Sequence, residues 1–491
     1  MIKRIDPSYA MLVVALVIGA ATRLIGLTSS SIYVDEIHTF QVATQPLRDM
    51  ISILAATDYH PPLFYAITHF LVGLHMPSDR WPHEWYRYFT APFALVTIVA
   101  TWAIARRLFG PVAAGVAALI IAIDPTSILW DRIYRMYVVF DALVAVSWWL
   151  LIEAERAEGR RRIVLWALFA LCAITQPYLH YLGILNVACQ FLYGLAKRRS
   201  AWPAAAGAVL AGLSFLPWLP YMLRQLPGGG LVAGTASLPI EWWTIARDAV
   251  LDGTPLAWIR APGFDVVVTF IVVAMCVWAA WSARRTVLPF WLLVAALQVV
   301  LSLISGKFLA APRYLLPVLP VFAIGVGQVV DRHLLLPNVR IAAFAVGGAI
   351  FALLAFCTTN VLFDPLYQFP DWNLVQSIFE QREQRSDIIV FDQGYMDEIS
   401  GAYGSTYVDH PELPIVGPTS VSALARWLSD NPKTRVWYIE NQYYYVDPNR
   451  RAISYLESMR PQLGEWLEPR VELSNRVYVV LFGPAHRFSR N

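Results

Sequence analysis

The sequence has 491 residues, of which 57% are hydrophobic and only 15% are charged. Soluble domains usually carry about 25% charged residues, so the composition excludes an ordinary soluble protein and predicts a polytopic α-helical membrane protein. The net charge of +3 is too small to indicate a nucleic-acid partner. The four cysteines stand in apolar stretches without metal-ligand spacing, and we expect them to be small core residues.

Apolar segments long enough to cross a bilayer recur along the first 360 residues. The first follows basic residues, as a signal sequence does, but no cleavage site follows it cleanly, and we expect a retained span. Lys and Arg recur in every second connection, which predicts that these connections are cytoplasmic and the others extracytoplasmic. A spanning helix needs about 20 apolar residues, and about eleven segments approach this length: 9–27, 86–105, 111–130, 137–153, 162–178, 179–196, 203–223, 264–283, 287–305, 312–330 and 339–360.

The first outer loop, residues 28–85, is much longer than a helix connection requires. Its apolar stretch at 61–74 is too short to span a bilayer, and we expect it to lie in the membrane interface. A loop of this length that also contains five of the nine histidines indicates a functional segment.

The chain changes character after residue 360. Strand-like segments at 386–392, 434–440 and 476–483 alternate with helical patterns, and Asp371 can cap the first of these helices. We therefore predict a membrane module at 1–360, which includes the first outer loop, and a small extracytoplasmic α/β domain at 361–491.

Two adjacent carboxylates, Asp35 and Glu36, follow the first predicted span closely, within "SSSIYVDEIHTF" (29–40). Apolar and aromatic residues flank them, so we expect at least one carboxylate to face protein. The ordinary alternative is a solvated loop start. A carboxylate held near headgroup depth in such surroundings is suited to act as a general base.

Two further outer motifs carry titratable groups. In "DYHPPLFY" (58–65), two prolines fix the backbone around Asp58 and His60, although a stiff helix entry would explain the same pattern. In "QPYLHYLG" (176–183), His180 stands among tyrosines, which is more typical of an interfacial aromatic belt.

Cations stand in two other outer segments. Arg132 and Arg135, in "DPTSILWDRIYRMYVVFD" (124–141), share a helical face if that segment is helical, or snorkel to headgroups. Lys307 and Arg313, in "SGKFLAAPRYLLPVLP" (305–320), run against the positive-inside trend. Acids from one loop and cations from two others suit a reaction in which a hydroxyl loses its proton and a phosphate departs, because cations stabilise the phosphate oxygens.

The order of these motifs resembles the GT-C membrane glycosyltransferases, in the branch of the protein O-mannosyltransferases and the lipid A aminoarabinose transferase (glycosyltransferase family 39). The resemblance covers about residues 9–330 and includes "HPPLFY", "RIYRMY" and "PRYLLPVLP". It implies a polyprenyl-phosphate-linked sugar donor and transfer outside the membrane with inversion at the anomeric carbon.

Single residues match the family's motifs. Asp35 matches its catalytic acid and Glu36 the neighbouring partner, while the binding positions are matched by His60, Arg87, Arg135, Tyr137, Arg313 and Tyr314. Some relatives have an acid immediately before the residue that heads Pro-Pro, whereas this chain has Tyr59 there and Asp58 one position earlier. We therefore do not expect the metal site of several carboxylates that some relatives have, and a divalent metal stays possible with unknown ligands.

We therefore expect an inverting glycosyltransferase of the inner or plasma membrane with an extracytoplasmic active site. Asp35 would deprotonate the acceptor hydroxyl, while Lys307, Arg313 and Arg135 hold the donor phosphate. The acceptor is a glycan, a lipid or a protein, and the sugar a hexose or a pentose. The alternatives are a transporter of polyprenyl phosphate or sugar-lipids and a catalytically inert membrane scaffold.

Overall fold

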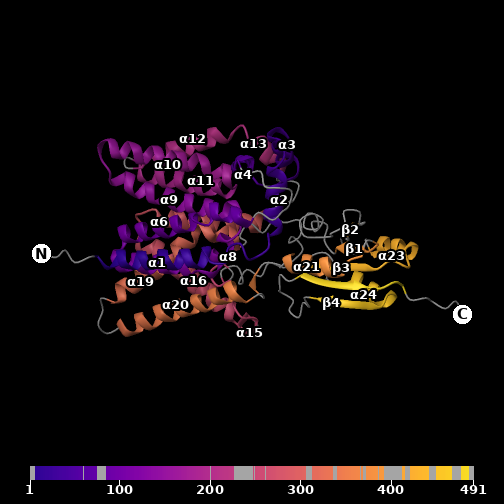
Figure 1. The fold of residues 1–491 in the computed structure, drawn as a ribbon. Coiled ribbons are helices and arrows are strands. Elements are labelled where there is room, and N and C mark those ends of the chain that lie inside the picture. Colours follow the sequence, from indigo (N-terminus) through magenta and orange to yellow (C-terminus); the bar gives the residue numbers. More distant parts are fainter. Residues whose placement is uncertain are drawn as a thin grey trace. The chain divides into compact units, whose positions relative to one another are not determined.

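The computed structural model describes residues 6–58, 60–74, 84–198, 201–225, 247, 249–259, 261–305, 312–334, 340–364, 367–368, 372–384, 386–391, 412–414, 421–441, 449–466 and 477–485. The chain divides into two compact units, and each is described by itself (Figure 1). Unit 1 comprises Met1–Leu27, Val42–His75 and Trp85–Phe363. The described residues of unit 2 fall within Thr28–Gln41, Met76–Glu84 and Asp364–Asn491.

Unit 1 is a bundle of apolar helices. Among the described residues, six helices are long and apolar enough to cross a membrane, or up to eight if each bent pair of helices forms one span. The chain is thus a multi-pass membrane protein. Its helices are α1 (Pro7–Leu24), α3 (Leu47–Thr57), α4 (Leu63–Leu74), α5 (Arg87–Thr90), α6 (Phe93–Leu108), α7 (Pro111–Ile123), α8 (Pro125–Asp131), α9 (Met136–Arg156), α10 (Gly159–Leu179), α11 (Leu182–Lys197), α12 (Trp202–Phe215), α13 (Leu219–Gln225), α15 (Leu256–Ile259), α16 (Phe264–Ser282), α17 (Leu288–Ser305), α18 (Pro312–Leu315), α19 (Leu319–Leu334) and α20 (Arg340–Phe363).

Each predicted span coincides with a helix or with a bent pair, but the predicted number of about eleven spans stays a prediction. The apolar helix α11 has 16 residues and is shorter than a full span. The four cysteines are all free thiols and all buried.

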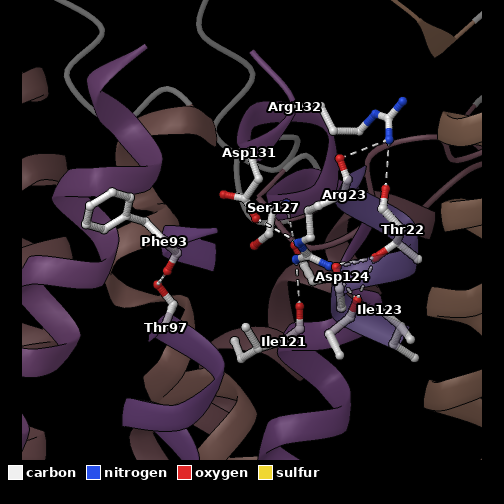
Figure 2. A network of polar contacts seen from close by, with 12 residues as sticks. Thr22, Arg23, Phe93, Thr97, Ile121, Ile123, Asp124, Ser127, Asp131 and Arg132 are labelled. Carbon is white, nitrogen blue, oxygen red and sulfur yellow. Dashed lines mark hydrogen bonds and ion pairs between the residues drawn. The ribbon is translucent and has the colours of Figure 1, made fainter. Parts of the chain in front are cut away.

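The third predicted span is broken between α7 and α8, which meet at an angle of 55°. Asp124 ends α7 and caps α8, because its side chain accepts a hydrogen bond from the Ser127 N–H at 2.7 Å, and Pro125 occupies the first helical position. Arg23 of α1 reaches this break and forms a buried ion pair with Asp131 at 3.0 Å (Figure 2). Removing one partner of such a pair costs about 3–5 kcal/mol, so the pair holds α1 against the break.

The described chain leaves helical geometry between α8 and α9. Arg132 and Arg135 both lie in this gap, so the condition under which they would share a helical face is not met. The physical reason is that α8 ends at Asp131 and α9 begins only at Met136, which frees the two side chains to point to different partners.

Close contacts between helices depend on glycine in α19. A Cβ at Gly325 would collide with the carbonyl oxygen of Met275 in α16, and a Cβ at Gly327 with that of Ala113 in α7. Small residues allow helix backbones to approach closely inside a membrane, where packing rather than the hydrophobic effect drives association.

Unit 2 contains a five-stranded mixed sheet in the order β2-β1-β3-β5-β4. Strands β2, β1 and β3 pair in parallel, and β5 is antiparallel to both β3 and β4. The strands are β1 (Ile388–Phe391), β2 (Glu412–Pro414), β3 (Val436–Asn441), β4 (Gln462–Trp466) and β5 (Val477–Phe482), and the helices are α2 (Val34–Ala43), α21 (Trp372–Arg382), α23 (Val421–Asp430) and α24 (Arg451–Met459).

Both faces of this sheet are covered, as the alternation of side chains along a strand requires. On β3, Trp437 and Ile439 join one apolar cluster, with α21, and Val436 and Tyr438 join the other, with α23 and α24. Strands are present in all three segments predicted as strands, and the proposed cap Asp371 lies outside the described residues.

Candidate functional site

A carboxylate-centred cluster forms in unit 1 where α3 ends. Asp58, 3% exposed, follows the last residue of α3. Its Oδ1 accepts a hydrogen bond from the His60 backbone N–H at 3.0 Å and lies 2.9 Å from His60 Nδ1. Its Oδ2 accepts from the Tyr65 hydroxyl at 2.5 Å. Burial, reinforced by the Asp58 charge, holds the pKa of the Tyr65 phenol well above its ordinary value, so Tyr65 keeps the proton it donates.

Arg135 connects this cluster to α9, at whose N-terminus it stands. The side chain is almost fully buried. Its Nη1 donates to the Tyr65 hydroxyl at 3.3 Å, and its Nη2 lies 3.5 Å from His60 Nδ1. The guanidinium is therefore held beside His60 by partners that are themselves fixed by Asp58.

His180 forms the next part of the site, between α10 and α11. Its ring centroid lies 6.0 Å from that of His60, 5.4 Å from Phe140, 5.8 Å from Tyr137 and 5.3 Å from Tyr314. The side chain is buried in protein, and its place in an interfacial aromatic belt stays a prediction.

The protonation of His180 follows from its contacts. The pKa of His180 is well below its ordinary value, chiefly because the ring is buried. The nearby groups His60, Arg313 and Arg135 lower this pKa further, so the ring is neutral at pH 7. Its Nδ1 accepts the Leu182 N–H at 3.2 Å, which places the proton of the neutral ring on Nε2. Nε2 is buried and has no hydrogen-bond partner in the described part of the chain. A buried N–H of this kind is a ready donor for a ligand oxygen.

Arg313 of α18 lies among three aromatic rings. Its guanidinium carbon is 5.2 Å from the ring centre of Trp130, 5.9 Å from that of Tyr137 and 5.1 Å from that of Tyr314. Contacts of this length are cation–π interactions. They orient the guanidinium, and its Nη2 also donates to the Tyr314 hydroxyl at 3.4 Å.

The described part of this cluster, called the cationic site below, contains two guanidinium groups, of Arg135 and Arg313, and one carboxylate, of Asp58. Guanidinium groups in a low-dielectric site form strong charge-assisted hydrogen bonds with a bound anion. The hydrogen-bond donors of the cationic site come from four separate segments of the chain, so they would contact a bound anion from several directions. Aromatic walls add an apolar surface of the kind that lines small-molecule sites.

Comparisons with known proteins give a fold. No protein-family model and no curated protein matches the sequence. Among solved structures, the Archaeoglobus fulgidus oligosaccharyltransferase in complex with zinc and sulfate aligns with a TM-score of 0.56 at 11% identity, over 95% of this chain and 73% of that chain. ArnT from Cupriavidus metallidurans in the apo state aligns with a TM-score of 0.51 at 14% identity, over 96% of this chain and 97% of that one. The fold is that of the GT-C glycosyltransferases.

Within this GT-C fold, most of the predicted binding residues come together. The cationic site unites Asp58, His60, Arg135, Tyr137, His180, Arg313 and Tyr314. Lys307, which was predicted beside Arg313, lies outside the described residues. Asp35 and Glu36 belong to unit 2 and are described within it.

Arg132 and Arg87 bind backbone at the end of α1. Arg132 donates to the carbonyl oxygens of Thr22 at 3.0 Å, Ile25 at 2.9 Å and Gly26 at 2.9 Å, and Arg87 donates to that of Leu27 at 3.0 Å. The last carbonyls of a helix lack partners within the helix. These contacts cap α1 and fix the start of the first outer loop, a role that the motif comparison did not predict.

In unit 2, Glu36 is the buried member of the acidic pair. It is 1% exposed, and its Oε2 accepts the Tyr33 N–H at 2.8 Å, which closes the first turn of α2. Asp35 is half-buried, and its backbone carbonyl accepts from the Thr39 hydroxyl at 2.8 Å. The acidic pair thus begins a short helix with a defined start.

The described residues contain no group of three or more His, Cys, Asp or Glu side chains able to hold a metal ion. They therefore supply no ligand set for the divalent metal that the resemblance made possible. Three residues of the cationic site were missed from the sequence: Tyr65, Trp130 and Phe140. Tyr65 had a signal, since it ends the "DYHPPLFY" motif, whereas apolar context alone cannot separate Trp130 and Phe140 from core residues.

Proposed function

We propose that this protein is a glycosyltransferase that moves a sugar from a polyprenyl-phosphate donor to an acceptor hydroxyl on the extracytoplasmic side of the membrane. The observation that carries the proposal is the cationic site, where buried Arg135, aromatic-bound Arg313 and the unpartnered Nε2–H of His180 lie together. A sugar linked to a lipid phosphate offers an anion for the guanidinium groups and a ring for the aromatic walls.

The solved relatives support this class of donor. The archaeal oligosaccharyltransferase AglB from Archaeoglobus fulgidus has been solved with an inhibitory peptide and a dolichol-phosphate, and that structure aligns with a TM-score of 0.52 at 10% identity, over 94% of this chain and 73% of that one. A protein of this fold thus binds a lipid phosphate, and the cationic site gives the present chain groups suited to the same ligand.

The donor phosphate binds Arg135 and Arg313 in this proposal, with Lys307 as a third cation. Arginine binds phosphate oxygens bidentately and lysine acts as a point charge. Because the leaving phosphate is a stable anion, the positive charge needed is greatest as the glycosidic bond breaks. His60, Glu36 and the His180 Nε2–H shape the sugar position.

Asp35 is the proposed general base. The acceptor hydroxyl oxygen attacks the anomeric carbon from the side opposite the phosphate, and its proton passes to Asp35. The bond between the anomeric carbon and the phosphate oxygen breaks, and its electron pair leaves with the polyprenyl phosphate. Attack from the opposite side inverts the anomeric configuration. No step requires a metal ion or a separate general acid.

The test is a transfer assay with the purified full-length protein in liposomes. Polyprenyl-phosphate sugars are supplied with envelope extracts as acceptors, and glycosylated product and released polyprenyl phosphate are measured by mass spectrometry. Asp35→Asn should lower turnover by about 10²–10⁴-fold, the usual contribution of a general base, with an unchanged melting temperature.

Three outcomes contradict the proposal. Near-normal turnover in Asp35→Asn removes the assigned base. Movement of the sugar-lipid across the bilayer without transfer to any acceptor supports a transporter. Loss of both acidic side chains, in Asp35→Ala with Glu36→Ala, without any change in cellular glycans or lipids supports an inert scaffold.

A further inference from the structure

Residues 28–41 bind the C-terminal sheet of unit 2 through a hydrogen bond that bridges 341 positions of sequence. The Ser31 hydroxyl oxygen accepts the backbone N–H of Trp372 at 3.0 Å. Trp372 is the first residue of α21, so this N–H is one of the donors that a helix N-terminus leaves without an intrahelical partner. Ser31 is itself buried. A side chain of the first outer loop therefore caps a helix of the C-terminal fold.

Two isoleucines of the same loop lie in the core of that fold. Ile32 and Ile37 are each 1% exposed and share an apolar cluster with α21 and with β1, β3 and β5. The other face of the sheet is covered by α23 and α24, as a cluster without any residue of the loop. The loop is thus part of one specific face of the unit 2 core.

Ile32 and Ile37 bracket the acidic pair. Between them, Glu36 closes the first turn of α2 onto Tyr33, and Thr39 bonds the Asp35 carbonyl. The backbone at Asp35 is therefore held by these hydrogen bonds within α2. It is also held by the buried side chains of Ile32 and Ile37, which pack into the core of unit 2. A carboxylate can act as a general base only within hydrogen-bond reach of the proton that it removes, so its fixed position matters to the rate.

We propose that the C-terminal fold of unit 2 positions the catalytic acid, so that α21 and the face of the sheet beneath it hold the segment that presents Asp35. This inference rests on the proposed function, in which Asp35 is the base. Ser31, Ile32 and Ile37 from the loop, with Trp372 and Ile378 from α21, are positioning residues. The phosphate-binding residues Arg135 and Arg313 belong to unit 1, so loss of positioning slows the chemical step and leaves the binding of polyprenyl phosphate intact.

The test compares two variants of the full-length protein in liposomes. Ile378→Ala opens a cavity in the cluster that contains the loop, and Leu428→Ala opens one of matched chemistry under α23, on the opposite face of the same sheet. We expect Ile378→Ala to lower kcat by about 10- to 100-fold, the usual effect of a small displacement of a catalytic group. Its dissociation constant for polyprenyl phosphate, which lacks the sugar, should stay within twofold of the wild type.

Two further measurements separate positioning from general damage. Hydrogen exchange of the α2 amides should rise at least tenfold in Ile378→Ala and stay unchanged in Leu428→Ala. Ile378→Val, which keeps most of the buried volume, should restore both kcat and amide protection.

Equal loss of kcat in Ile378→Ala and Leu428→Ala overturns the inference, as does normal kcat in Ile378→Ala with unprotected α2 amides. If Ile378→Ala does not fold, Ser31→Ala replaces it, with a smaller expected loss of kcat and of α2 amide protection. The proposed function fails differently, by normal transfer in Asp35→Asn, while the exchange measurement tests the attachment of the loop without reference to any activity.

Discussion

Arg132 and Arg135 stand three positions apart and bind different parts of the molecule. Arg132 caps the end of α1 through three backbone carbonyls, whereas Arg135 lies in the cationic site beside Tyr65 and His60. Two arginines in the same short non-helical link between α8 and α9 therefore have different partners. The guanidinium of Arg132 binds backbone carbonyls, and that of Arg135 lies in the cationic site.

We predict that Arg135→Ala raises the KM for the donor by about 10- to 100-fold, since a hydrogen bond to a charged group contributes about 1.5–3 kcal/mol. Arg132→Ala is the matched control, with an unchanged donor KM and a lower melting temperature. Transfer kinetics and thermal unfolding in detergent check both. A donor KM that rises equally in the two variants would contradict the assignment.

His180 makes stability depend on pH. Its folded-state pKa is held well below the ordinary value, so below about pH 6.5 the unfolded chain binds a proton that the folded protein does not. The free energy of unfolding therefore falls as pH drops below that value. We predict that His180→Gln, which cannot be protonated, loses less melting temperature between pH 7.5 and 5.0 than the wild type does. Parallel melting curves would contradict this account.

At the scale of elements, glycines set how closely α19 approaches its neighbours. We predict that Gly327→Ala, which forces a methyl group into the Ala113 carbonyl, lowers stability by about 1–3 kcal/mol, as overpacking usually does. Gly212→Ala in α12 is the control, because a Cβ there meets no atom within 4 Å, and it should be neutral or slightly stabilising. Thermal unfolding in detergent measures both, and equal losses would contradict the packing argument.

The sequence predicted the positions of the helices well and their breaks poorly. Long apolar segments reveal spans because their length is set by the bilayer. The 55° bend at Asp124 could not be read from apolarity, although Asp124 followed by Pro125 is a helix-start signal inside one predicted span. Once α8 is recognised as a separate helix, the different directions of Arg132 and Arg135 follow from its end at Asp131.

At the scale of the whole molecule, the division into two units differs from the predicted domains in the first outer loop. The last segment of unit 2 begins at Asp364, close to the predicted boundary, but the unit also takes in Thr28–Gln41 and Met76–Glu84, which the sequence assigns to the membrane module. Nothing in the local pattern of Ile32 and Ile37 could predict this, because their partners lie more than 300 positions away in the chain. The binding residues were predictable as motifs, while the convergence of His180 with Arg313 required the fold.

The predicted sidedness can be tested with cysteine labelling, because the four native cysteines are buried and should react slowly. Ser458→Cys in α24 and Arg161→Cys at the start of α10 each introduce a thiol at an exposed position. A membrane-impermeant maleimide is added to intact cells whose outer membrane, if there is one, has been permeabilised. It should label Ser458→Cys directly and Arg161→Cys only after the cells are lysed. The reverse pattern would overturn the assigned topology.

The hydrogen bond between Ser31 and Trp372 has a consequence for biosynthesis. The two residues leave the ribosome about 20–70 seconds apart at about 5–20 residues per second. During that interval the segment with the acidic pair has been made but its partner helix has not. A chain released early would insert its helices and keep its guanidinium groups, yet α2 would lack the surface that orders it. Completion of synthesis thereby becomes a condition for assembling the acidic segment, and under the proposed function a prematurely terminated product would be inactive in the membrane.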